Sequence, residues 1–382
     1  MEEWKTYKIS EITTMTNGKK RQQSNGNIPV YGGNGIMDYC SESNCENTVI
    51  IGRVGAYCGC VYLATGLCWI SDNAISIKNN YLTDLHYLFY LLKSLDLNHH
   101  HIGAAQPLMT QDVIGRIEVS IPTLSFQKQI AAILSSLDSK IELNNRINHN
   151  LEEQAQALYK SWFVDFEPFK DGKFIESELG MIPEGWRVGQ LSEICNIVGG
   201  GTPSKAIPSY YTTKGIAWLT PKDLSIKCCK FTSRGSEDIT DEGYASCSAK
   251  LMPRGSVLFS SRAPIGYLTI AKNEICTNQG FKSAVPTKAG TGYLYYYLLS
   301  NTSKIESKAS GSTFKEASGS LMKNLPVVIP TSLIIKKFEE EINTIFLLQE
   351  NCEEQIVKLQ HLRDTLLPKL MSGELKINEI DC

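Results

Sequence analysis

Few stretches of the sequence match a known pattern of catalytic residues. Glu3-Trp4-Lys5 and Glu374-Leu375-Lys376 fit the Glu-x-Lys half of a nuclease signature, but neither follows a strand that carries an acidic partner. The sequence holds no GxxxxGK(S/T) phosphate loop, no GxSxG nucleophile elbow and no HExxH zinc motif. It also lacks the Asp/Asn-Pro-Pro-aromatic motif of amino-methyltransferases. We therefore interpret the two Glu-x-Lys matches as chance and predict a non-catalytic chain, unless its site is of an unfamiliar kind.

Cysteine and histidine, the usual metal ligands, are not arranged as a metal site. The 12 Cys are scattered over the chain and none forms a CxxC pair, whereas zinc sites usually show paired Cys or His at short spacing. We expect reduced, mostly buried thiols and no bound metal. The triplet His99-His100-His101 is expected in a polar loop after a helix, and the Gly-rich segment from Gly199 to Pro203 is expected to form a tight turn.

Composition indicates a globular protein of two or three domains. The chain has 382 residues, of which 42% are hydrophobic and 20% are charged. No run of 18 uncharged apolar residues predicts a membrane span, and the start MEEWKTYKIS has no apolar segment of a secretory signal. The net charge of −2 lacks the basic footprint that nucleic-acid binding usually leaves. DNA binding would therefore have to rest on other features and on help from a partner.

Two long segments predict the helices around which the chain is organised. Ser125 to Phe163 contains no Pro or Gly and predicts a helix about 58 Å long, and Thr331 to Met371 repeats its heptad register 208 residues later. Both seams are mainly apolar with polar residues near the middle, including Asn144 and Gln349. The alternative is two unrelated amphipathic helices, each packed on its own domain. The residues predicted to pack helix against helix are Ile130, Leu134, Leu137, Ile141, Leu151, Leu158, Phe338, Ile342, Ile345, Ile356, Leu359 and Leu366.

The sequence outside these helices is also repeated. Matching residues occur in the same order: Trp4 and Trp186, Ile12 and Ile194, Ile121 and Ile329. The offset grows from 182 residues at Ile12 to 208 at Ile121, so the second copy is longer. Asn73 aligns with Asn278 at an offset of 205, which places most of the extra residues early in the module, and Tyr31-Gly32-Gly33-Asn34 has no clear counterpart.

Short strands and short helices alternate in each copy without a βαβ rhythm, which favours an α+β fold. We predict two globular domains separated by two long antiparallel, coiled-coil-like helices with pseudo-twofold symmetry. The predicted boundaries are residues 1–124 for the first domain, 125–166 for the first helix, 167–182 for a linker, 183–330 for the second domain, 331–371 for the second helix and 372–382 for a tail.

Several segments together resemble the specificity (S) subunit of type I restriction–modification systems. They are IPVYGGNG from Ile28, the GRVG turn from Gly52, the helix entry from Ile121 to Ala131, LEEQAQALYKSWFVDF from Leu151, GMIPEGW from Gly180 and LRDTLLPKLMSGEL from Leu362. The resemblance covers nearly the whole chain. It implies two target recognition domains, each of which binds one half of a split double-stranded DNA target, on a spacer of two paired helices.

The same resemblance implies partners and a cellular location. The S subunit of this family is non-catalytic and docks two methyltransferase subunits, and restriction–translocation subunits join the full complex. S-adenosylmethionine, Mg²⁺ and ATP would be bound by those partners and not by this chain. We expect a cytoplasmic, nucleoid-associated bacterial or archaeal protein that directs adenine methylation and restriction. A scaffold that joins two protein-binding modules without DNA, or an unrecognised nuclease or methyltransferase, stays open as an alternative.

The resemblance also directs attention to side chains that contact bases. Arg and Lys favour guanine and Asn and Gln favour adenine, from loops that enter the groove. Arg53 and Arg262 are the stronger candidates, because each follows a buried strand that would aim its side chain. Trp162, Phe163 and Phe166 either dock a partner or close the hydrophobic end of the helices. The candidates for DNA contact are Lys19, Lys20, Arg21, Tyr31, Asn34, Arg53, Asn73, Gln106, Lys205, Lys222, Arg262, Asn278, Gln279, Thr313 and Lys315.

Overall fold

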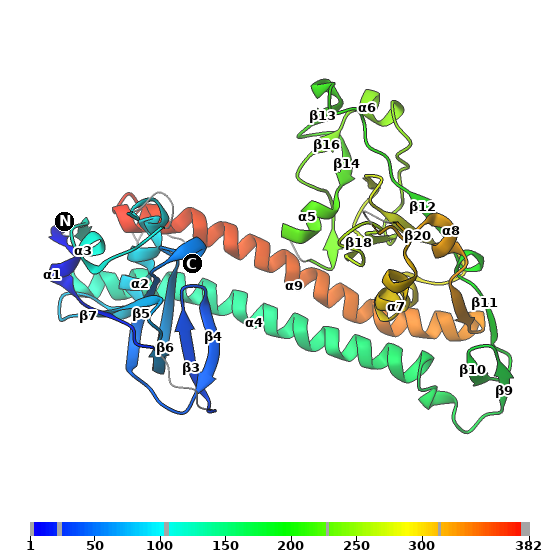
Figure 1. Cartoon of the computed structure of the whole chain (residues 1–382), viewed down its shortest axis with the longest axis horizontal. Coiled ribbons are helices and arrows are strands. Elements are labelled where there is room, and N and C mark those ends of the chain that lie inside the picture. Colours follow the sequence, from blue (N-terminus) through cyan, green and yellow to red (C-terminus); the bar gives the residue numbers. More distant parts are fainter. Residues whose placement is uncertain (1–3, 21–24, 103–106, 227–228, 312–314, 376–382) are drawn as a thin grey trace. The chain divides into compact units, whose positions relative to one another are not determined.

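The structure, a computed structural model, divides into two compact units. It describes residues 4–20, 25–102, 107–226, 229–311 and 315–375. Unit 1 comprises residues 1–143 and 356–382, and unit 2 comprises residues 144–355. The two longest helices, α4 (Leu124–Phe163) and α9 (Ser332–Ser372), each contribute one half to either unit (Figure 1). The fold is α+β, as predicted, and within the described residues no helix is both long and apolar enough to cross a membrane.

Unit 1 contains module 1 (residues 4–123), a sheet with apolar cores on both faces. The six strands have the order β2-β7-β5-β6-β3-β4, of which β3 to β7 are labelled in Figure 1. A separate antiparallel pair joins β1 to β8. Val49 and Ile51 of β5 face the main core, whereas Ile50 faces a smaller one, which is the alternation expected of a strand buried on both sides. The elements are β1 (Lys5–Lys8), α1 (Ile9–Ile12), β2 (Thr13–Asn17), β3 (Ile28–Gly32), β4 (Gly35–Cys40), β5 (Cys45–Gly52), β6 (Val61–Ile70), β7 (Ala74–Asn79), α2 (Leu85–Ser94), α3 (Gln111–Gly115) and β8 (Glu118–Ile121).

Unit 2 contains module 2 (residues 183–331), which has more and shorter strands. A five-stranded sheet has the order β12-β20-β17-β18-β15 and a four-stranded sheet the order β13-β16-β14-β19. Strands β13, β14 and β16 lie together with α6 at one end of the module (Figure 1). The elements are β11 (Arg187–Gln190), β12 (Cys195–Gly199), β13 (Tyr211–Thr212), β14 (Ile216–Leu219), α5 (Pro221–Ile226), β15 (Phe231–Thr232), β16 (Asp238–Ile239), α6 (Asp241–Ala245), β17 (Val257–Phe259), β18 (Leu268–Ala271), β19 (Cys276–Thr277), β20 (Lys282–Pro286), α7 (Thr291–Lys308), α8 (Gly319–Lys323) and β21 (Pro326–Ile329).

Backbone pairing shows the sequence repeat directly. The register of β1 with β8 places Lys5 opposite Ile121, and the register of β11 with β21 places Arg187 opposite Ile329. Arg187 follows Lys5 by 182 residues, and Ile329 follows Ile121 by 208 residues, which are the offsets read from the sequence. Each module is therefore closed by the same antiparallel pair, formed between its first and its last strand.

The structure corrects one alignment within the repeat. The amide of Ala74 donates to the carbonyl oxygen of Ser71, and the amide of Phe281 donates to that of Asn278, 207 residues later. Asn278 therefore corresponds to Ser71, and the predicted match with Asn73 is wrong by two residues. An Asn in both loops suggested a false match, because the position of a residue in a loop is set by its backbone hydrogen bonds and not by its side chain.

Strand pairing also supplies the missing counterpart of Tyr31. In module 1, β3 pairs parallel to β6 with Tyr31 opposite Ile70. In module 2, β14 pairs parallel to β19 with Leu219 opposite Thr277. Tyr31 thus corresponds to Leu219, although no residue type is shared around the two positions.

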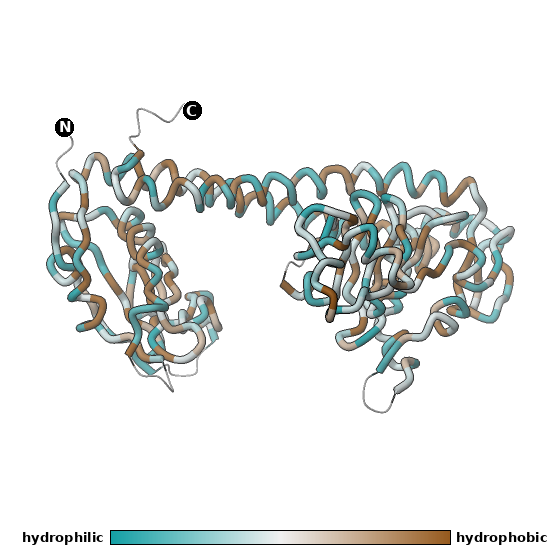
Figure 2. Tube along the Cα trace, turned by 90° about the horizontal axis from the view of Figure 1, so that it is seen from above, coloured by the Kyte–Doolittle hydropathy of each residue, from teal (hydrophilic) through white to brown (hydrophobic). Residues whose placement is uncertain are grey.

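The two long helices contact each other in both units. In unit 1 the Arg363 guanidinium lies 2.7 Å from the Asp138 carboxylate. In unit 2 the Phe163 and Phe338 rings have centroids 4.7 Å apart, and Gln349 donates to the carbonyl oxygen of Asn148. Partner numbers fall along α9 as they rise along α4, so the pairing is antiparallel. Hydrophobic and hydrophilic residues alternate along the long helices (Figure 2), and each of the twelve predicted packing residues is buried or half-buried.

Each half of a long helix also packs on a module. The structure therefore combines the two predicted arrangements, in which the helices either pair with each other or pack on their own domains. In unit 2 the Glu339 carboxylate of α9 accepts hydrogen bonds from the amides of Gly292 and Tyr293 at the start of α7. In unit 1 Leu134 of α4 and Leu370 of α9 belong to the main core of module 1. The helices therefore join the cores of both units as well as pairing with each other.

The segment predicted as a linker, residues 167–182, is not an extended chain. It contains the antiparallel hairpin of β9 (Phe174–Ser177) and β10 (Gly180–Pro183). Trp186, directly after the hairpin, packs on Phe166 and Phe169 with ring centroids 5.6 and 4.9 Å apart. Aromatic packing on the end of α4 thus holds the segment whose Pro, Gly and charge content had suggested a linker between the two copies.

Candidate nucleic-acid interface

At one edge of the module 1 sheet, loops from distant parts of the chain are joined by backbone hydrogen bonds. The amide of Ser71 donates to the carbonyl oxygen of Tyr31 at 2.9 Å, and that of Arg53 donates to Asn73 at 2.9 Å. The amide of Lys19 donates to the carbonyl oxygen of Ile70 at 3.0 Å. We call this set the loop edge of module 1: residues 18–20, 31–34, 53–57 and 71–73.

Module 2 forms the corresponding edge with the corresponding bonds. The amide of Asn278 donates to Leu219 at 3.0 Å, and that of Ser261 donates to Gly280 at 2.7 Å. The amide of Gly201 donates to Thr277 at 2.9 Å. The loop edge of module 2 comprises residues 200–205, 219–222, 261–262 and 278–280. Most predicted DNA-contacting residues lie on these two edges, which gives each module one surface where they are gathered.

On the loop edge of module 1, Lys19, Lys20, Asn34 and Asn73 are exposed to solvent. Tyr31 is half-buried, and this burial raises the pKa of its phenol. The nearby Cys68 thiol and Tyr39 phenol raise it further, by a smaller amount. Exposed ammonium and amide groups can reach a groove, whereas Tyr31 also belongs to the smaller apolar core. Two further predicted residues of this module, Arg21 and Gln106, lie outside the described residues.

Within the described residues, Arg53 and Ser71 are the two residues of this edge that have a buried side-chain polar atom without a hydrogen-bond partner, and Arg53 is the charged one. Its side chain is half-buried, and within the described residues its Nε has no hydrogen-bond partner although the atom is inaccessible to solvent. A buried donor without a partner costs about 1–3 kcal/mol. Its backbone is held at both ends, since its amide donates to Asn73 and its carbonyl accepts from Met109 at 2.8 Å. The arginine is thus fixed at its backbone, while its buried Nε donor is unpaired.

On the loop edge of module 2, Lys205 and Lys222 are exposed, and so is the neighbouring Lys315. Asn278 and Gln279 have internal partners: the Asn278 side chain accepts from the amide of Gly280 at 2.9 Å, and Gln279 bonds to the hydroxyl of Thr202. Asn278 therefore shapes its own turn, which makes it a weaker candidate for a base contact than the sequence suggested. Thr313 lies outside the described residues.

Arg262 does not occupy the position of Arg53. Isolated β-bridges pair Val54 with Leu108 and Arg262 with Glu316, so Arg262 corresponds to Val54, and the counterpart of Arg53 is the buried Ser261. Neighbouring residues of an extended chain point to opposite sides. The two arginines therefore follow equivalent strands but are aimed in different directions.

Glu316 neutralises part of the positive charge at Arg262. Its carboxylate accepts hydrogen bonds from Arg262 Nε at 3.0 Å and from Lys282 Nζ at 3.1 Å. Partial burial opposes ionisation, but these two cations hold the pKa of Glu316 below its usual value. Sequence reasoning missed this carboxylate, because it lies 54 residues from Arg262 and only the β-bridge brings the two together.

A second residue that sequence reasoning missed is Tyr57. Its ring is 52% exposed, and it lies against Gly33 on the loop edge of module 1. Exposed aromatic rings can stack on bases or sugars. Its place two residues after the GRVG turn was the available signal.

Trp162, Phe163 and Phe166 lie inside unit 2. Trp162 packs on Phe338 at 5.8 Å between ring centroids, and Phe163 packs edge-on to Tyr293 at 4.8 Å. Phe163 is buried and the other two are half-buried. They close the hydrophobic end of the helix pair, which was one of the two predicted roles.

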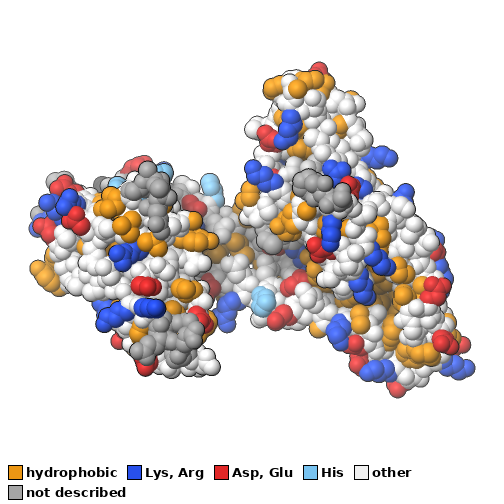
Figure 3. Space-filling view, in the orientation of Figure 1, with side chains coloured by type: hydrophobic (Ala, Val, Ile, Leu, Met, Phe, Trp, Pro, Cys, Tyr) orange, Lys and Arg blue, Asp and Glu red, His pale blue; other side chains and the backbone are white. Residues whose placement is uncertain are grey.

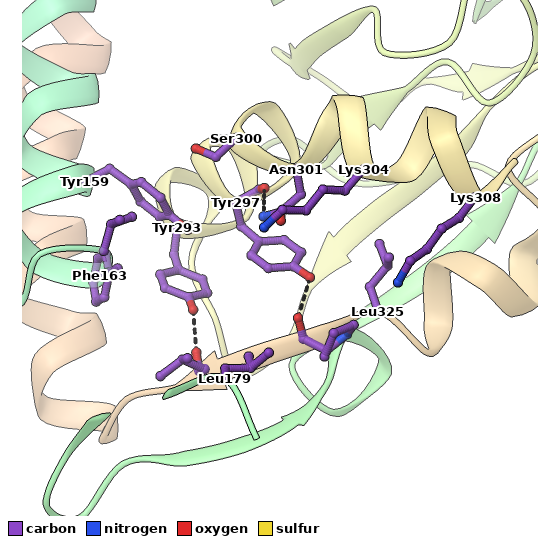
Figure 4. A pocket seen from close by; sticks show the side chains of 13 residues that line it. Tyr159, Phe163, Leu179, Tyr293, Tyr297, Ser300, Asn301, Lys304, Lys308 and Leu325 are labelled. Carbon is purple, nitrogen blue, oxygen red and sulfur yellow. Dashed lines mark hydrogen bonds between the residues drawn. The ribbon is translucent and has the colours of Figure 1, made fainter. Parts of the chain in front are cut away.

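A cavity of about 330 Å³ beside this cluster has no arrangement typical of catalysis. Figure 4 shows its tyrosines turned toward backbone carbonyls: Tyr293 donates to Val328 at 2.5 Å and Tyr297 donates to Pro326 at 2.9 Å. Burial raises the pKa of both phenols. Among the residues that line it the charged groups are Lys304 and Lys308, so the lining offers no acid–base pair.

Charge and metal-binding groups are dispersed over the surface. On the face drawn in Figure 3, Lys and Arg side chains are scattered with acidic groups among them rather than gathered in one basic patch. Over the described part of the chain no group of three or more His, Cys, Asp or Glu side chains is placed to hold a metal ion.

Comparison with known proteins gives a consistent result. A family model described as the type I restriction modification DNA specificity domain matches residues 1–153 and 183–352. The MjaIX specificity subunit of Methanocaldococcus jannaschii is 39% identical over 162 residues, which are 42% of this chain and 37% of that protein, so this match spans little more than a third of the relative. The HindI specificity subunit of Haemophilus influenzae is 27% identical over 358 residues, covering 76% of this chain and 77% of that protein.

One solved structure shares the fold over nearly the whole chain. The S subunit of a type I restriction-modification system from M. genitalium superimposes with a TM-score of 0.67 at 15% identity. The match covers 97% of this chain and 96% of that chain. The similarity therefore includes both modules and both long helices.

Proposed function

The chain belongs to the type I restriction modification DNA specificity family, and from this premise we propose that it recognises an asymmetric, two-part DNA target for partner methyltransferase subunits. Each module binds one half of the target through its loop edge. Adenine methylation, translocation and cleavage are assigned to partner subunits, which would bind S-adenosylmethionine, Mg²⁺ and ATP. The chain itself contributes recognition and spacing.

The observation that carries this proposal is a shared backbone with unlike side chains. At two corresponding positions of the loop edges, fixed by corresponding backbone hydrogen bonds, module 1 has Lys19 and Arg53. Module 2 has Gly201 and Ser261 at the same positions. Base readout depends on the donors and acceptors that a side chain presents in the groove. Two edges with the same backbone and different donors would select different bases, which supports an asymmetric target.

The long helices have the length that a spacer between two half-sites needs. Two half-sites read on the same face of B-DNA lie one turn apart, ~34–36 Å, or a multiple of that. Helices α4 and α9 have 40 and 41 residues, which at ~1.5 Å per residue correspond to about 60 Å. The antiparallel contacts within each unit support their role as paired rods.

Exposed apolar side chains on α9 support partner docking. In the unit 2 part of α9, Leu347 is 63% exposed and its neighbour Leu348 is also exposed. Apolar residues on the outside of a helix mark an interaction surface when they cluster. We assign this face to a methyltransferase subunit, which would also supply the positive charge that this chain of net charge −2 lacks. The isolated chain is then expected to bind DNA weakly and the complex tightly, and equal affinities would contradict this.

A map of methylated adenines in cells with and without the chain tests the proposal. The expected result is one set of methylated sites, present only with the chain, that shares a two-part asymmetric sequence with a fixed gap. A perfect palindrome or one contiguous site would overturn the two-module model. Absence of any sequence preference would favour a scaffold, and turnover of DNA by the pure chain with Mg²⁺ or S-adenosylmethionine would favour an enzyme.

A further inference from the structure

In both modules a tryptophan indole holds the loop that follows the first strand of the main sheet. Trp69 Nε1 donates a hydrogen bond to the carbonyl oxygen of Lys19 at 3.2 Å. Trp218 Nε1 donates one to the carbonyl oxygen of Gly201 at 3.1 Å. Lys19 and Gly201 are corresponding residues, 182 positions apart, so the same carbonyl is bound in each module.

The same short loop is held by two further contacts in each module. The amides of Lys19 and Gly201 donate to corresponding carbonyls of the adjacent loop, at 3.0 and 2.9 Å. A glycine precedes both residues, and a Cβ at either glycine would collide with a backbone carbonyl oxygen of that adjacent loop. Both edges thus require two backbone segments to approach closely. In each module the indole binds the carbonyl of the residue that follows the glycine.

The two tryptophans are not corresponding residues. In module 1 the parallel pair of β3 and β6 places Val30 opposite Trp69. In module 2 the corresponding pair of β14 and β19 places Trp218 opposite Cys276. Residues directly opposite in a sheet project from the same face. The indole therefore reaches one carbonyl from either of two adjacent strands, with a small residue opposite it in both cases.

We propose that Trp69 and Trp218 are positioning residues that set the recognition loops of module 1 and module 2, respectively. The inference rests on the proposed function, because it assigns these loops to DNA. The tryptophan lies on a different strand in each module, but its indole binds the same carbonyl. This indicates that both modules retain the hydrogen bond to the loop and not the position of the tryptophan in the sheet.

The held loops carry candidate contact residues. In module 1 Lys19 carries the bound carbonyl and Lys20 follows it, and both side chains are exposed. In module 2 the bound carbonyl precedes Thr202, which bonds to Gln279, and Pro203, whose carbonyl accepts from Tyr211 at 2.7 Å. A loop that is ordered before it meets DNA loses less conformational entropy on binding. Loss of the indole bond is therefore expected to weaken selection by one module and leave the other intact.

Hydrogen exchange of the full chain tests the anchoring without DNA. Trp69→Phe keeps an aromatic ring but removes the donor, and we expect the amides of residues 18–20 to exchange about fivefold to tenfold faster, as for the loss of one hydrogen bond. Trp218→Phe is the matched control: it should leave residues 18–20 unchanged and accelerate residues 200–202. Unchanged exchange of both loops in their own variants would overturn the inference.

Selection from a random double-stranded DNA library tests the link to recognition. The full chain is used together with the methyltransferase subunits of its own host. Trp69→Phe should lower base preference in one half of the target about tenfold, and Trp218→Phe should do so in the other half. A wild-type complex without any preference would overturn the proposed function. A wild-type preference that neither variant alters would overturn only this inference.

A transplanted indole gives the sharpest test. The double variant Val30→Trp, Trp69→Cys copies the arrangement of module 2 into module 1 at nearly constant side-chain volume. It should restore both the slow exchange of residues 18–20 and the half-site preference that Trp69→Cys alone loses. Restored packing with exchange as fast as in Trp69→Cys would show a merely structural tryptophan and would overturn the inference.

Discussion

The loop edges of module 1 and module 2 share their backbone contacts but differ in the side chains that they expose. Both use a glycine at the point of closest backbone approach, an amide bond to the adjacent loop and an indole bond to the next carbonyl. The side chains that face outward are different, and the single arginine of each edge occupies a different position: Arg53 is half-buried without a partner at Nε, whereas Arg262 is bound to Glu316. Conserving the backbone contacts while exchanging exposed groups lets one architecture present two chemical surfaces.

The two units also differ in how polar groups hold the helices. In unit 2 the Lys230 ammonium is buried and bonds to Glu152, to the Tyr296 hydroxyl at 2.6 Å and to Gln349 at 2.9 Å. Burial lowers the pKa of Lys230 to about 8, although the Glu152 carboxylate opposes that shift. In unit 1 the corresponding role falls to an ion pair that is more accessible to solvent, Asp138 with Arg363.

Truncation of Lys230 in unit 2 and of Arg363 in unit 1 is expected to show the largest difference in stability between the units. Lys230→Ala leaves Glu152 partly buried without its cation, which costs about 3–5 kcal/mol of unfolding free energy for a buried pair. Arg363→Ala should cost about 1 kcal/mol, as for more exposed pairs. Hydrogen-exchange protection of α7 in unit 2 and of α2 in unit 1 measures the two effects separately. Equal losses in both units would refute the contrast between a buried and an accessible network.

A smaller effect is expected from adding one methyl group to a loop edge. Gly200→Ala forces a Cβ against the carbonyl oxygen of Asn278, and we expect a loss of about 1–3 kcal/mol in local stability, as for overpacking. Gly199→Ala is the matched control, since the nearest atom to a Cβ there is the end of the flexible Lys282 side chain at 4.0 Å. Local exchange of residues 200–203 measures both. A Gly199→Ala variant as unstable as Gly200→Ala would contradict the close approach.

The two arginines are expected to respond differently. Arg53→Ala should remove about 1–3 kcal/mol of base discrimination in one half of the target and leave the other half intact. Arg262→Ala should change discrimination less, because its guanidinium already has a carboxylate partner in the free chain. DNA selection with the complex measures both variants. Equal relaxation of both halves by Arg53→Ala would instead indicate misfolding.

The smallest effect concerns the pH dependence of unit 2. The folded pKa of Lys230, about 8, lies below the ordinary value of 10.5, so the unfolded chain binds more protons between these values. Relative to a Lys230→Met variant, the stability of unit 2 should therefore rise by roughly 1.5 kcal/mol from pH 8 to about 9.5. The comparison is made against the variant because burial raises the pKa of Cys195 and of Cys276 to about 12, which lowers stability over the same pH range in both proteins. Denaturant unfolding followed by a probe in unit 2 measures the difference, and parallel pH profiles of the two proteins would contradict the burial of a charged lysine.

Much of the fold followed from patterns that are local in the sequence. A heptad register repeated after 208 residues predicted both long helices, because helix periodicity shows in any window of a few turns. The repeated Trp-to-Ile and Ile-Pro segments predicted two modules of one fold. The predicted ends of α4 differ from the observed ones by at most three residues, since Thr123 and Phe163 bracket the helix without strong stop signals.

The candidate site could be predicted only as a set of loops. Buried strands ending at Gly52 and Phe259 indicated where loops emerge, and this located Arg53 and Arg262 near the edges. Whether a side chain in these loops can bind DNA depends on whether another residue of the chain, far away in sequence, already binds it. Glu316 beside Arg262 and the amide of Gly280 beside Asn278 are such partners, and no local pattern indicates them.

The sequence by itself determined the duplication, the two helices with their register and the unequal length of the modules, since each of these is a comparison of residue types along one chain. Only the tertiary structure decided that Asn278 matches Ser71, that Lys230 is buried between both helices and module 2, and that an indole reaches one carbonyl from two different strands. The physical reason is that hydrogen-bond partners and burial are properties of neighbours in space, which sequence order does not specify.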